Sequence, residues 1–141
     1  MATRSDFTDD EWEAMQHGVT GAGALVSVSD RDFTDTFGEA SALAKALAAY
    51  REQSDSVVIR ELAKARGAGF GLTDSPQEME AKTLAALQSA LETLAAKAPD
   101  ETERYREFVL GVANAVAEAK GGLSDQEAQA LGKIKGALDT A

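Results

Sequence analysis

The chain has 141 residues, 44% of them apolar, no cysteine and a formal net charge of −10 at pH 7. This length fits one domain with its own core, and the missing cysteines exclude disulfides and thiolate metal sites. The negative charge argues against a nucleic-acid partner or an anionic membrane surface. Many residues are alanine, leucine, glutamate, glutamine or lysine, which favour helices, so we predict an all-α fold.

The first predicted helix begins at a capping box. Thr8 precedes an apolar helical pattern and Glu11 follows three residues later, so each side chain can bond to the other residue's main-chain amide. Gly18 is predicted to stop or bend this helix. A second helix of small residues is expected over 21–28, where glycines allow a neighbouring backbone to approach closely.

The sequence pattern in the middle of the chain predicts two further helices and a loop. A helix is expected from a cap at Thr34 to Leu47, and a short one ends at Gly67. The glycine-rich run 67–71 is predicted to be an interhelical loop. A phosphate-binding role is disfavoured, because no strand precedes this run and no Lys-Ser or Lys-Thr follows it.

Three more helices are expected in the second half. Ser75 and Pro76 mark one start, Asp100 is a predicted cap for the next, and Ser124 with Glu127 forms another capping box. Helical spacing predicts a buried face for each of these three helices. In the first it consists of Leu84, Leu87, Leu91, Leu94 and Ala98. In the second it consists of Tyr105, Phe108, Val109, Val112 and Val116, and in the third of Leu131, Ile134 and Leu138. The expected architecture is a compact bundle of six or seven helices in a single domain, residues 1–141.

Two stretches of the sequence resemble each other. Residues 39–45 and 127–133 share five identities in seven positions, and the likeness predicts a duplicated helix-loop-helix core made of segments 19–47 and 109–138. The competing interpretation is a composition effect, since short matches arise by chance in an alanine-rich chain.

The segment 116–127, Val-Ala-Glu-Ala-Lys-Gly-Gly-Leu-Ser-Asp-Gln-Glu, resembles the helix-loop-helix signature of the tellurite-resistance TerB-like domains. The resemblance implies a bacterial, all-helical protein of two related halves that serves a stress or tellurite-resistance system, with loop acids that hold metal ions. It places Asp30, Glu39 and Glu127 at acid positions of the family. Lys120 stands where another acid is expected, and a lysine there opposes a cation.

Acidic residues are the strongest candidates for a ligand site. The predicted set is Asp30, Asp32, Asp35, Glu39, Asp125 and Glu127, with Glu118 nearby if the two halves pack symmetrically. Carboxylates without histidine or cysteine suit hard divalent cations such as calcium, magnesium or manganese. The spacing is not that of an EF-hand. The competing interpretation is that these acids cap helices and complement helix dipoles.

Catalytic residues are not evident. His17 is the only histidine, so a carboxylate-bridged di-metal site, zinc hydrolysis and Ser-His-Asp chemistry lack their key residues. His17 beside Gly18 is interpreted as a dipole partner at a helix C-terminus or as a partly buried side chain. We predict that the chain is not an enzyme.

An aromatic patch near the amino end has two interpretations. Phe7, Trp12 and Met15 either pack into the core or, if exposed, form a partner-binding surface or a dimer contact.

Function is therefore expected from one of two classes. The first is a non-enzymatic TerB-like module of a bacterial stress response that binds divalent cations through loop carboxylates. The alternative is a structural bundle that binds a protein partner or itself and needs no small ligand. No secretory signal or membrane span is predicted, so a cytoplasmic location is expected.

Overall fold

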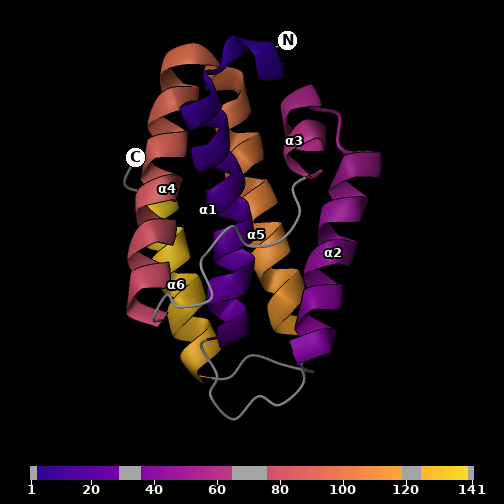
Figure 1. Cartoon of the computed structure of the whole chain (residues 1–141), viewed down its shortest axis with the longest axis vertical. Helices are drawn as coiled ribbons and strands as arrows, with labels where there is room; N and C mark the ends of the chain where they lie inside the picture. The colour runs from indigo at the N-terminus through magenta and orange to yellow at the C-terminus, as the bar shows by residue number, and fades with distance from the viewer. Residues whose placement is uncertain (1–2, 29–35, 65–75, 119–124, 140–141) are drawn as a thin grey trace.

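The computed structural model describes residues 3–28, 36–64, 76–118 and 125–139, which form a bundle of helices (Figure 1). The α-helices are α1 (Asp9–Val28), α2 (Thr36–Gln53), α3 (Val57–Leu62), α4 (Pro76–Lys97), α5 (Thr102–Glu118) and α6 (Asp125–Asp139). Two 3₁₀ turns, η1 (Arg4–Asp6) and η2 (Pro99–Glu101), precede α1 and α5. The predicted all-α bundle is confirmed, and the described residues contain no strand.

The helix α1 lies against α4 and α5, and α5 also packs against α2. The helices α1 and α5 run in one direction, whereas α2, α4 and α6 run in the other (Figure 1). The short α3 packs on α2 and α5, and α6 packs on α4, α5 and α1. This arrangement gathers the start of α5, the end of α2 and the start of α3 at one end of the bundle.

The start of α1 confirms its predicted capping box. The Thr8 amide donates to Glu11 Oε1 at 2.8 Å, and the Glu11 amide donates to Thr8 Oγ1 at 3.1 Å. On either side of the cap, the rings of Phe7 and Trp12 lie 6.0 Å apart between centroids. This hydrophobic pair directs the chain into the helix, as a staple does.

The predicted stop at Gly18 is wrong, because α1 continues without a break to Val28. A Cβ atom added to Gly18 would overlap the hydroxyl of Tyr105 and lie 3.0 Å from Leu87 Cδ2. The same hydroxyl donates to the Met15 carbonyl at 2.8 Å. Glycine at position 18 therefore allows α4 and α5 to approach α1 closely, and the packing around it keeps the residue helical.

Other helix boundaries agree with the sequence in part. Pro76 is the first residue of α4, as predicted. The described part of the fourth predicted helix ends at Leu62, with a turn at 63–64. Asp100 does not cap α5, because it lies inside the 3₁₀ turn η2. The predicted features that lie outside the described residues are the caps Thr34, Ser75 and Ser124, the helix end at Gly67 and the loop 67–71.

The core contains the apolar faces that helical spacing predicted. On α5 every predicted residue is buried, and on α4 and α6 only Leu84 and Leu131 are partly exposed. Tyr105, Phe108, Met15, Ile59 and Leu62 are among the largest side chains with almost no exposed surface. None of the described helices is long and apolar enough to cross a membrane.

Candidate functional site

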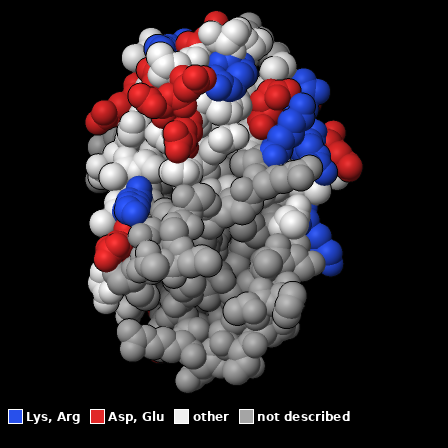
Figure 2. Space-filling view, viewed as in Figure 1, with Lys and Arg blue, Asp and Glu red and all other residues white. Residues whose placement is uncertain are grey.

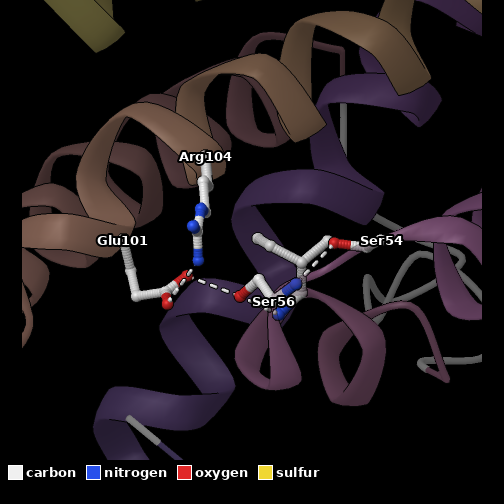
Figure 3. A network of polar contacts seen from close by, with 5 residues as sticks. Ser54, Ser56, Glu101 and Arg104 are labelled. Carbon is white, nitrogen blue, oxygen red and sulfur yellow. Dashed lines mark hydrogen bonds and ion pairs between the residues drawn. The ribbon is translucent and has the colours of Figure 1, made fainter. Parts of the chain in front are cut away.

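A buried polar network joins the start of α3 to the start of α5 (Figure 3). The carboxylate of Glu101, in η2, is only 3% exposed. Its Oε2 accepts a hydrogen bond from Ser56 Oγ at 2.5 Å, and its Oε1 pairs with Arg104 Nη1 at 3.3 Å. A buried carboxylate costs free energy unless it is paired and hydrogen-bonded, and here both oxygens have partners.

Ser56 is the central member of this network. As the N-cap of α3 it accepts a hydrogen bond from the Ile59 amide at 3.2 Å, which is the usual role of serine before a helix. Its own amide donates to Ser54 Oγ at 3.2 Å. Since the Ser56 hydroxyl is buried and engaged as both donor and acceptor, it holds α3 in place and is not presented as a nucleophile.

A hollow of about 300 Å³ adjoins the network between α2, α3 and α5. Its walls are mostly polar, and they are formed by Tyr50, Gln53, Ser54, Asp55, Ser56, Ile59, Arg104 and Glu107. A neighbouring hollow of about 450 Å³ shares Tyr50, Gln53 and Ser54. Sites for small ligands have volumes of about 300 to 1,000 Å³, so the two hollows together have the size of such a site.

Tyr50 is the aromatic residue among the three that line both hollows. Its ring packs edge-on against Phe108, with centroids 4.8 Å apart and planes inclined by 66°. Its hydroxyl lies over Gly111, where an added Cβ would overlap it, and donates to the Glu107 carbonyl at 3.5 Å. Burial, and then the negative charge of Glu107, raise the pKa of Tyr50. The phenol therefore stays protonated at neutral pH.

Charged side chains of both signs lie at this end of the bundle. In the view of Figure 2, acidic and basic side chains are neighbours over its upper part, where α1 begins and α3 lies. Several form ion pairs, among them Lys97 with Glu11 at 2.5 Å and Lys64 with Glu61 at 3.0 Å. The Lys97 hydrogen bond, with the Thr8 amide bond, lowers the pKa of the Glu11 carboxyl.

Of the six predicted metal ligands, the structure describes the side chain of one. Asp30, Asp32 and Asp35 are not described, and Glu39 and Glu127 lie on α2 and α6 with undescribed side chains. Asp125 is exposed, as the first residue of α6. Within the described ranges, no three histidine, aspartate or glutamate side chains are grouped to hold a metal ion. The cation site stays a prediction.

The fold does bring together the helix ends that flank the acidic connection 29–35 and the connection 119–124. Because α1 and α5 run in the same direction, both end at one end of the bundle, where α2 and α6 begin (Figure 1). The residues at these four helix ends are Val28, Thr36, Glu118 and Asp125. This end is opposite to the one that contains the Glu101 network.

The aromatic patch predicted as a partner-binding surface is buried. Phe7 and Trp12 are each 6% exposed and Met15 has no exposed surface. Arg4 covers the Trp12 ring, with its Cζ 4.9 Å from the ring centroid. The patch therefore packs in the core, as the first interpretation predicted. The alternative prediction, an exposed partner-binding surface or dimer contact at these residues, is wrong.

His17 lies within α1 rather than at a helix end. Its Nε2 is 3.8 Å from Glu13 Oε1, one helical turn earlier, and its side chain is 35% exposed. The partly buried side chain was predicted, but the role as a C-terminal dipole partner is wrong, because α1 continues for three more turns.

The network and the hollow were missed in the sequence. Ser56 before Val-Val-Ile is a recognisable cap signal, and it would have placed the start of α3. The partner of Ser56 is 45 residues away along the chain, and no local pattern indicates that Glu101 is buried beside it.

Comparison with known proteins identifies no relative: no family model, curated protein or solved structure matches this chain.

Proposed function

We propose that the chain is a non-enzymatic, TerB-like helical module of a bacterial stress-response system that binds divalent cations through carboxylates in and beside its α1–α2 and α5–α6 connections. One observation supports this proposal: the helix ends that flank both connections lie at the same end of the bundle (Figure 1). Asp30 follows the end of α1 by two residues and Asp125 begins α6. Acids that are far apart in the sequence therefore belong to helix ends, or follow helix ends, that lie together.

The chemistry of these residues fits hard cations. Calcium, magnesium and manganese prefer oxygen ligands, and carboxylates supply both charge and coordination. Four acids lie in positions 30–39, which cover the first connection and the start of α2: Asp30, Asp32, Asp35 and Glu39. Because Lys120 repels a cation, we expect this first set to supply more of the ligands than the second connection.

The test is thermal denaturation with calcium, magnesium, manganese or zinc after treatment with a chelator. A ligand that binds only the folded state stabilises it by about 2.7 kcal/mol at a hundredfold excess over its Kd. We expect one or more oxygen-preferring cations to raise the melting temperature. A melting temperature that no cation changes would refute the proposal.

A double variant locates the ligands. Asp30→Ala with Glu39→Ala should abolish the cation-induced rise while leaving the helical circular dichroism signal intact. Glu52→Ala with Glu92→Ala makes the same change of charge at exposed positions elsewhere and should keep the full rise. An equal loss in both variants would mean that cations act through net charge alone.

Self-association without a small ligand is the second candidate function, and α6 carries the observation that favours it. Gly132 and Gly136 lie four residues apart and are exposed, and a Cβ added to either would have no atom within 4 Å. Each interior glycine costs a helix about 0.5–1 kcal/mol relative to alanine, and within the described chain no atom lies where a side chain at either position would be crowded. Two glycines one turn apart on an exposed surface allow a second helix to approach closely there.

Sedimentation velocity over a range of concentrations tests this candidate. Self-association predicts a dimer that Gly132→Ala with Gly136→Ala converts to monomer, although the variant should itself be more helical. High salt should strengthen the dimer, since it screens the repulsion between two chains of charge −10. A monomer at every concentration would exclude this function.

A further inference from the structure

We propose that the hollow between α2, α3 and α5 binds a primary alkylammonium group, supplied by a free polyamine or by a lysine side chain of a partner. The proposal rests on the acceptor-rich walls of the hollow, the charge around it and the ring of Tyr50. It is independent of the cation site proposed above, which lies at the opposite end of the bundle.

The first argument is the supply of hydrogen-bond acceptors. The helix α2 ends beside the hollow, and its last backbone bond runs from the Ser54 amide to the Tyr50 carbonyl at 3.0 Å. Among the carbonyls that follow this bond, that of Gln53 belongs to a residue lining the hollow and has no donor within the helix. An ammonium group has three donors and no acceptor, so it complements such a helix end, where the dipole also favours positive charge.

The second argument is the charge of the lining. Asp55 and Glu107 are exposed carboxylates on the rim of the hollow. Among the described residues that line it, Arg104 is the one cation, and its charge is balanced by Glu101. Within this described lining, two carboxylates are therefore left without a cation. The basic side chains Arg51 and Arg60 belong to α2 and α3 but do not line the hollow.

The third argument is shape. The wall shared by the two hollows contains the ring of Tyr50, held in place by its packing on Phe108. An alkyl chain attached to the ammonium group can pack against this ring while the head group meets the acceptors. The two adjoining hollows suit a linear ligand that extends along the end of α2.

Isothermal titration calorimetry of the full chain, with ¹H–¹⁵N NMR, tests the proposal. The probes are spermidine, Nα-acetyl-lysine methylamide, and the same amide acetylated on its side chain. We expect saturable binding of at least one charged probe, none of the acetylated amide, and the largest amide shifts at residues 50–56 and 104–107. Much tighter binding of spermidine would assign a free polyamine, and similar affinities would assign a lysine side chain.

Charge-matched variants separate this site from general attraction to an acidic protein. Replacing an exposed carboxylate lowers the affinity by about two- to fivefold, so Asp55→Asn with Glu107→Gln should weaken binding by about four- to twenty-five-fold. Glu92→Gln with Asp139→Asn removes the same two charges at exposed positions of α4 and α6 and should have little effect. The proposal is overturned if neither charged probe saturates at millimolar concentration, or if this control weakens binding as much as the double rim variant does.

Discussion

Each of the chain's two tyrosines places its hydroxyl over a glycine of a neighbouring helix and donates to a main-chain carbonyl there. Tyr105 of α5 does this at Gly18 of α1, with no exposed surface and a hydrogen bond of 2.8 Å. Tyr50 of α2 does it at Gly111 of α5, where it is half-buried and the hydrogen bond is 3.5 Å. The same local contact thus occurs once in the core and once at the surface.

The difference between the two contacts is the freedom of the tyrosine to move. Tyr105 is enclosed by the core, and Leu87 also approaches the glycine it covers. Tyr50 borders the hollow beside α2, so its ring has open space on one side. We infer that the buried contact determines how closely α1 and α5 pack, whereas the surface contact can adjust to a change in its glycine.

Gly18→Ala should have the largest effect. Overpacking a well-packed core costs about 1–3 kcal/mol, and the added methyl also displaces the Tyr105 hydroxyl from its carbonyl. The gain in helix propensity, about 0.5–1 kcal/mol, offsets only part of this cost. Urea denaturation should show a net loss of stability. The same substitution at Gly132, where nothing lies within 4 Å, should stabilise the monomer, and a stabilising Gly18→Ala would refute the close contact.

Alkaline pH should destabilise the fold through Tyr105. Burial raises the pKa of this tyrosine above the ordinary value of 10.0, so the folded state keeps a proton that the unfolded state loses. The contribution is present below pH 10 and is lost as the pH rises above 10. At pH 11 the loss is about 1.4 kcal/mol for one such group. Tyr105→Phe should reduce the decline in unfolding free energy between pH 9 and 11, and an unchanged decline would contradict the burial.

Tyr105→Phe should cost about 1 kcal/mol at neutral pH, because it removes one buried hydrogen bond without creating a large cavity. Tyr50→Phe should cost less, since its hydrogen bond is longer and partly open to water. Parallel urea titrations of the two variants measure the difference. Equal losses would show that burial does not distinguish the two contacts.

Gly111→Ala should have the smallest effect, a change of less than about 1 kcal/mol in either direction. The added methyl would overlap the Tyr50 hydroxyl, but this ring can move toward the hollow while alanine improves the helix. The melting temperature should therefore stay close to that of the parent chain. A loss as large as that of Gly18→Ala would show that Tyr50 is held as rigidly as Tyr105.

Much of the fold was predictable because its signals are local. The Thr8 capping box and the buried face of α5 depend on residues three or four positions apart, and both are confirmed. The candidate site was less predictable. The Ser56–Glu101 pair spans 45 residues, and the residues that form the hollow carry no pattern that distinguishes them from other surface residues.

Composition, capping residues and helical spacing by themselves determined that this chain forms a bundle of amphipathic helices, because they act within one or two helical turns. Only the tertiary structure decided that Gly18 continues a helix, that Phe7, Trp12 and Met15 are buried, and that Glu101 pairs with Ser56. These features depend on which helices become neighbours. Their free energies come from packing and desolvation between distant segments, which no single segment contains.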